Sequence, residues 1–180
     1  MTMKTLRTTL PVLALAALAA AGCFLVSGQF VVNFALPTPL LVTSGATFAG
    51  VDVDLNTVGD YADHKAELKR VDDLALIGDF KNNAGAAAQV ECWIVPAGTL
   101  NLTPVQLAST GVKLWGPLNV AAGATEKVDW NRSAGLFVGR QTLIDEIKGD
   151  GHFSLYVIAN GAFNVTVTNG AVIAVVGAAK

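Results

Sequence analysis

Short runs of alternating or β-branched apolar residues recur along most of the chain, and turn residues separate them. They predict strands over 47–55, 74–81, 89–95, 112–115, 125–130, 153–159, 163–168 and 171–176. Residues 27–35 are either a further strand or the end of a tether, because Pro37 and Pro39 directly after them cannot continue a central strand. About eight short strands with turns between them indicate an antiparallel stack of sheets.

The strongest local signal lies in the last two runs. Asn169-Gly170 between them is the preferred pair for a two-residue type I′ turn, because both residues tolerate positive φ. The sequence therefore predicts a hairpin in which Val167 lies opposite Val172. One face of this hairpin should point into the core, and it carries Phe163, Val165, Val167, Val172 and Val176.

Three helices are predicted between the strands, over 60–71, 104–108 and 139–148. The first has Asp60 as its cap, and the second has proline at its first helical position. With these short crossovers, the predicted fold class is an all-β antiparallel β-sandwich, immunoglobulin-like or jelly-roll-like. The sandwich domain is expected to occupy residues 41–180.

The chain begins with the layout of a secretory signal peptide. Lys4 and Arg7 make a basic start, and residues 10–21 are an almost unbroken apolar run. Small residues at 20–22 then stand directly before Cys23. The pattern predicts that the rest of the chain is exported.

The small residues followed by Cys23 resemble the lipobox of bacterial lipoproteins, although Ala20 stands where that pattern usually has leucine. The resemblance implies that a dedicated peptidase removes residues 1–22 and that the Cys23 thiol receives a lipid. Residues 23–40 would then be a lipid-anchored tether or first strand. Phe24, rather than aspartate, resembles the pattern that sends such proteins to the outer membrane. The expected partner is thus a membrane, reached through the lipid anchor.

Two other interpretations of the signal peptide, called the leader from here on, remain. An ordinary signal peptidase would cut at a nearby alanine and leave Cys23 free to form a disulfide with Cys92. Alternatively, residues 10–26 would stay as an uncleaved anchor, although the alanine that dominates them contributes little to membrane insertion. In the lipoprotein interpretation, Cys92 is a buried structural thiol and not a catalytic one, because no histidine lies near it in sequence.

Net charge and chain length reduce the number of function classes and domain arrangements that fit this chain. Two of the 12 basic residues lie in the leader, so the exported chain has ten against 14 acidic residues, a net charge of −4. This mildly negative charge argues against nucleic acid as a partner. The 158 residues that follow the leader are the size of one ordinary domain.

The sequence contains no recognisable catalytic or cofactor motif. His64 and His152 are its two histidines, and there is no nucleophile elbow, zinc-binding helix or phosphate-binding glycine loop. We therefore expect a protein that is not an enzyme and that has no cofactor.

One stretch carries oxygen ligands at the spacing of an EF-hand calcium loop, at Asp52, Asp54, Asn56, Asp60 and Asp63. Thr57 stands at the position that needs glycine for the sharp turn. The alternation of Val53 and Leu55 with these residues explains the same spacing. The default interpretation is the solvated face of a strand, with no metal.

Two functions of different classes fit these features. The first is a structural or protein-interaction domain of the cell envelope, which would use exposed sheet edges or a flat face against another protein or against copies of itself. The second is a carbohydrate-binding module at the cell surface, because aromatic faces stack on sugar rings. Its candidate ligand-binding residues are Trp93, Trp115 and Trp130.

Overall fold

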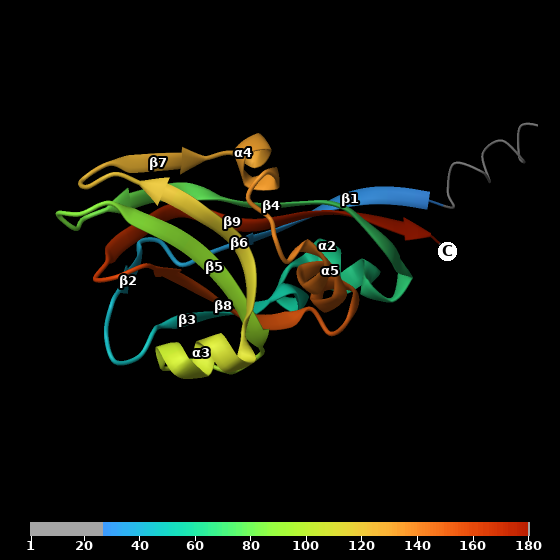
Figure 1. The fold of residues 1–180 in the computed structure, drawn as a ribbon. Coiled ribbons are helices and arrows are strands. Elements are labelled where there is room, and N and C mark those ends of the chain that lie inside the picture. The colour runs from blue at the N-terminus through green and yellow to red at the C-terminus, as the bar shows by residue number, and fades with distance from the viewer. Residues whose placement is uncertain (1–26, 180) are drawn as a thin grey trace, which may run out of the picture.

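The computed structural model describes residues 27–179 (Figure 1). Two antiparallel sheets face each other, which confirms the predicted all-β antiparallel sandwich. The five-stranded sheet, here called the β9 sheet, contains β1 (Ser27–Ala35), β9 (Asn164–Ala179), β4 (Leu68–Asn82) and β7 (Thr125–Val128) in that order, with β2 (Leu40–Thr43) also on β9. The four-stranded β8 sheet contains β3 (Gly50–Asp54), β8 (His152–Ala159), β5 (Ala88–Pro96) and β6 (Val112–Val120).

The core lies between the two sheets. Side chains alternate along the strands, so the apolar half of each strand faces the opposite sheet. On β5, for example, Val90, Cys92 and Ile94 are buried in this core, while Glu91 and Trp93 lie on the outer face. The predicted core face of the last two runs is also confirmed, because Phe163, Val165, Val167, Val172 and Val176 are all buried.

The predicted hairpin at Asn169-Gly170 is wrong. Both runs belong to one continuous strand, β9, and Asn169-Gly170 forms a bulge in it opposite Gly78 of β4. Asn169 still has the left-handed conformation, with φ of 53°. A two-residue turn and a two-residue bulge both place Val167 and Val172 on the same face, so the local pattern is the same for either. The structure has the bulge because β9 pairs with β4 on both sides of Asn169-Gly170.

The predicted helix over 60–71 is half as long as expected. The chain forms α2 (Gly59–His64) and a short 3-10 turn, and β4 already begins at Leu68. The reason is that residues from Leu68 onward pair with β9, starting opposite Ala178. Long-range backbone pairing therefore replaces the helix that the local sequence favours.

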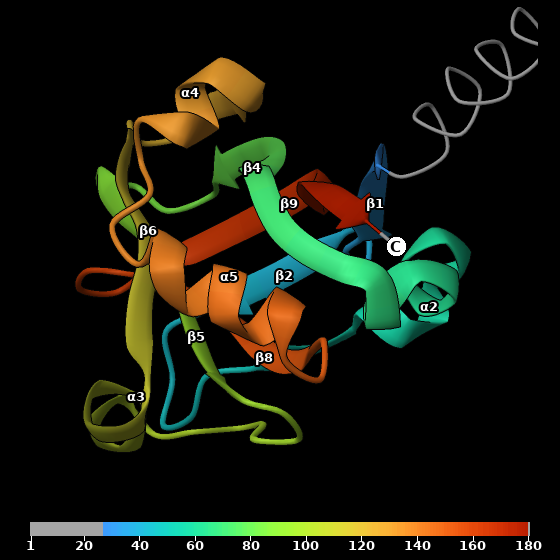
Figure 2. The same cartoon turned by 90° about the vertical axis from the view of Figure 1, so that its right-hand side faces the viewer.

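The other two predicted helices are confirmed as α3 (Pro104–Thr110) and α5 (Arg140–Lys148). Thr103 caps α3 in a capping box with Gln106, and α3 packs on the outer face of the β8 sheet. Helix α5 closes one end of the sandwich, where Figure 2 shows it between β4 and β8. A further short helix, α4 (Trp130–Ala134), follows β7 and packs against β4.

Candidate functional site

Cys23, which the sequence analysis expects to be lipidated, lies outside the described residues. The segment for which the sequence left a tether or a first strand open forms β1, which pairs with β9 over its whole length. No helix within residues 27–179 is long and apolar enough to span a membrane.

The residues with calcium-loop spacing do not form one site. Asp54 caps a 3-10 turn and accepts hydrogen bonds from the backbone and the side-chain nitrogen of Asn56. The Asn56 oxygen accepts from the Lys65 ammonium at 3.0 Å, and the Asp150 carbonyl accepts from the same ammonium at 2.5 Å. The Lys65 ammonium, a cation of the chain itself, therefore already uses two of the oxygens beside Asp54.

The remaining members of that set point elsewhere. Asp60 and Asp63 are exposed on α2, and Asp52 faces His152 on the neighbouring strand. Across residues 27–179, no three His, Cys, Asp or Glu side chains are grouped as a metal site requires.

The pairing of β3 with β8 creates a polar cluster that the sequence did not reveal. His152 Nε2 lies 2.7 Å from Asp52 Oδ2, and Ser154 donates to Asp52 Oδ1 at 3.1 Å. The backbone N–H of Gly98 donates to the same oxygen. The hydrogen bond to His152 lowers the pKa of Asp52 and raises the pKa of His152. Only the register of two strands 100 residues apart places these groups together.

This cluster differs in its connections from a serine-histidine-aspartate triad. In a triad, the serine hydroxyl donates to the histidine, which then removes its proton. Here Ser154 is fully buried, and its hydroxyl donates to Asp52. The Asp52 carboxylate therefore lies between His152 and Ser154, and its hydrogen bonds connect β3 to β8 and to the loop at Gly98.

The three tryptophans are distributed over the core and both outer faces. Trp115 is fully buried, stacks on Phe80 at 5.6 Å between ring centroids, and donates to Ser133. Trp93 is half-buried on the outer face of the β8 sheet, where its Nε1 donates to Glu91. Trp130 lies at the start of α4 beside the β9 sheet. The indoles consequently do not share one exposed platform.

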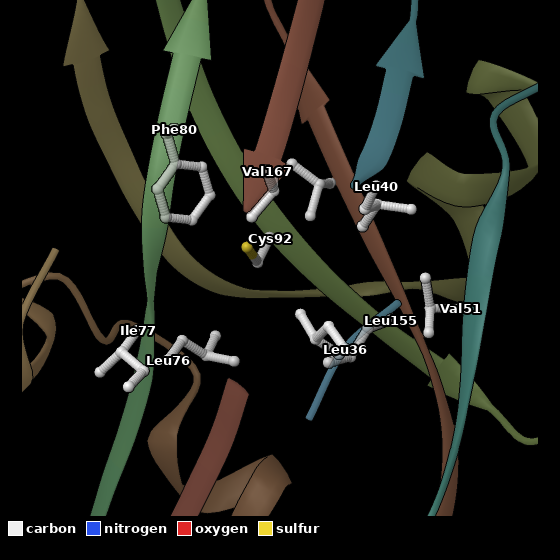
Figure 3. Close-up of a pocket in the computed structure, with 10 residues that line it drawn as sticks. Leu36, Leu40, Val51, Leu76, Ile77, Phe80, Cys92, Leu155 and Val167 are labelled. Atoms are coloured by element: carbon white, nitrogen blue, oxygen red, sulfur yellow. The ribbon is translucent and has the colours of Figure 1, made fainter. Parts of the chain in front are cut away.

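A small gap remains in the core between the sheets, as Figure 3 shows. Its volume is about 20 Å³, and its lining includes Leu36, Phe80, Leu155 and Val167 with the thiol of Cys92. An apolar gap of this size holds no organic ligand. Cys92 is buried as predicted, and burial raises its pKa to about 12. The thiol is therefore not a nucleophile near neutral pH.

A larger, open hollow lies on the outer side of the β9 sheet, with a volume of about 370 Å³. The Asn169 bulge and Gly78 form part of its lining, together with Trp130. Trp130 Nε1 donates to Asp73, which holds the indole in place, and Asn169 donates to Asp79 at the rim. The lining of the hollow thus combines one aromatic ring with two carboxylates, a lysine and an amide.

Strand β1 differs from the other edge strands of the two sheets. It spans nine residues without charge or proline and pairs with β9 without a register shift. The edge strands β7 and β3 have four and five residues and carry charges, and β2 has four and follows two prolines. On β6, the segment 136–138 bonds to the backbone of Leu114 and Gly116 and covers the edge. Within residues 27–179, β1 is therefore the longest edge strand without charge, proline or a segment bonded along it, although α2 packs against it where His64 lies 5.1 Å from Phe30.

The outer face beside this edge is apolar around Val31 and carries an amide on either side of it, Gln29 and Asn33. Val31 of β1 is 53% exposed and pairs with Val175 of β9, and Asn33 pairs with Ile173. Figure 2 shows β1 on the side of β9 opposite β4. We call β1 and this adjoining outer face the β1 edge.

Comparisons of the chain with family models, with curated proteins and with solved structures find no match.

Proposed function

We propose that the chain is exported, lipidated at Cys23, and acts at the cell envelope as a structural or protein-interaction domain. The observation that carries the interaction is the β1 edge, a nine-residue uncharged strand with one sheet neighbour among residues 27–179. Natural sheets usually protect such edges with charges, prolines or bulges, because a free edge pairs readily with another chain. An edge of this length without charge, proline or a bulge supports a role in binding an added strand.

The lipid anchor is tested by the intact mass of protein extracted from membranes. We expect loss of residues 1–22 together with added acyl mass on the new amino terminus. Cys23→Ser should leave an unprocessed precursor, because the modified thiol is absent. A soluble, unmodified protein that begins at another residue would contradict lipidation, and complete retention in the inner membrane would contradict the outer-membrane location.

The interaction is tested in intact cells with a photo-reactive amino acid at position 31. Val105 on α3 is the matched control, because it is 79% exposed and lies on the opposite sheet. We expect position 31 to link reproducibly to a protein and position 105 to link only to background. Equal background linking at both positions would exclude the β1 edge as a protein-binding site.

A carbohydrate-binding module is the second candidate, and the hollow beside Trp130 is the observation that favours it. An aromatic ring next to carboxylate and amide groups suits a sugar ring with its hydroxyls. Retention on a polysaccharide column that is lost in Trp130→Ala and kept in Trp93→Ala would support this function. Retention that is equal in both variants would show that the hollow does not bind the polysaccharide.

A further inference from the structure

We propose that the β1 edge binds a second copy of this chain, with the two β1 strands antiparallel across a two-fold axis at Val31. This inference rests on the proposed interaction function and names the partner. The two β9 sheets, each of five strands, would then form one continuous sheet of ten. Such a contact uses the same surface on both copies, as two-fold symmetric dimers require.

The length of β1 determines where the axis lies. The strand runs from Ser27 to Ala35, so Val31 is its central residue. The antiparallel register that pairs all nine residues therefore places Val31 opposite Val31 of the second copy. Any other register would leave part of the strand backbone unpaired.

The side chains are self-complementary in this register. On the outer face, Gln29 lies opposite Asn33 of the second copy, so that two amides meet. In the single chain the Gln29 nitrogen donates to Asp72 of β4 at 2.6 Å, and the two side chains that face each other across the seam are uncharged amides. On the inner face, Phe34 lies opposite Gly28 of the second copy. Within residues 27–179, no atom apart from the chain neighbours of Gly28 lies within 4 Å of the position where a side chain at Gly28 would begin, so that position is open toward the phenyl ring.

Charge and exposure also favour a copy of the same chain. The strand carries no charge, so two copies do not repel each other along the edge, although the exported chain is negative overall. Val31 is 53% exposed in the single chain, and pairing would cover it with its own counterpart. The contact involves one strand from each copy and is therefore small, and attachment to a common membrane would raise the effective concentration of the two copies.

Disulfide trapping in membranes tests the axis directly. In full-length Val31→Cys, the two introduced thiols would face each other across the seam, within reach of a disulfide. Background from Cys92 is low because this thiol is buried and its pKa is raised to about 12. We expect at least roughly tenfold more disulfide-linked dimer than in Val105→Cys, a similarly exposed control on the other sheet.

The register is tested with two differently tagged chains, one Gln29→Cys and the other Asn33→Cys. When they are co-expressed, a mixed disulfide should form, because these positions face each other across the axis. Each variant alone should form little homodimer, since its two thiols are about 13 Å apart along the strand direction. Val31→Lys places like charges at the axis and should weaken self-association in detergent at least about tenfold, with unchanged thermal stability.

The outcomes separate the partner from the function. A disulfide yield no higher for Val31→Cys than for Val105→Cys, with no mixed disulfide from the 29 and 33 variants, would overturn self-pairing. If the photo-reactive residue at position 31 then still captured a different protein, the interaction function would stand. If it captured no protein, both would fail.

Discussion

His152 on β8 and Asp52 on β3 lie side by side on the outer face of the β8 sheet, with 2.7 Å between Nε2 and Oδ2. The hydrogen bond to Asp52 raises the pKa of His152, and the nearby carboxylates of Asp54 and Asp150 act in the same direction. The same bond lowers the pKa of Asp52. The pair therefore links the stability of the β3–β8 contact to pH.

We expect this pair to stabilise the fold most between the ordinary pKa values of the two groups, 3.8 for Asp52 and 6.5 for His152. As the pH rises through the raised pKa of His152, its stabilisation is lost, and as the pH falls through the lowered pKa of Asp52, the carboxylate contribution is lost. The thermal midpoint of the wild type should exceed that of His152→Gln at about pH 5.5 and approach it at about pH 8.5. A difference independent of pH would contradict the role of the charged pair.

Asn169 allows a test of the bulge in β9. Asn169→Val should lower the free energy of unfolding by about 1–2 kcal/mol, because a β-branched residue is disfavoured at positive φ. Asn169→Gly keeps the backbone conformation and loses only the exposed bond to Asp79, so it is the matched control. Urea denaturation of both variants measures the difference. Equal stability would show that position 169 does not have positive φ.

The two faces of β9 should differ sharply in their tolerance of charge. Val165 is fully buried, and Val165→Asp should cost roughly 3 kcal/mol or more because it places a carboxylate in the core. Thr166 lies on the outer face, where its hydroxyl accepts from Asn83 at 2.8 Å, and an aspartate there accepts the same bond. Thr166→Asp should therefore cost less than about 1 kcal/mol. Equal tolerance at both positions in urea denaturation would mean that the register is wrong.

Ser133 holds α4 to the core. Its fully buried hydroxyl accepts from the backbone N–H of Leu76 at 2.8 Å and from the Trp115 indole at 3.3 Å. Ser133→Ala leaves both donors without this partner and should lower the free energy of unfolding by about 2 kcal/mol. Ser109→Ala on the exposed face of α3 is the control and should change stability by less than about 0.5 kcal/mol. Calorimetry that finds similar small losses in both would contradict this role.

The sequence alone was sufficient for the features that depend on neighbouring residues. Alternation of apolar residues predicted the core faces of β5 and β9, because side-chain direction along a strand changes with every residue. Proline at the first helical position predicted α3, and the run over 139–148 predicted α5, since helix boundaries depend on neighbouring residues. The sandwich class followed from the number of short predicted strands and from the turn residues that separate them.

Only the tertiary structure decided the features that depend on which strands pair. Pairing with β4 made Asn169-Gly170 a bulge, and pairing with β9 turned Leu68 and its successors from helix into strand. The contact between Asp52 and His152 and the open edge of β1 likewise exist only in the assembled sheets. Residues far apart in the chain supply these backbone hydrogen bonds and packing contacts. A local sequence pattern does not specify which distant strand will pair with it.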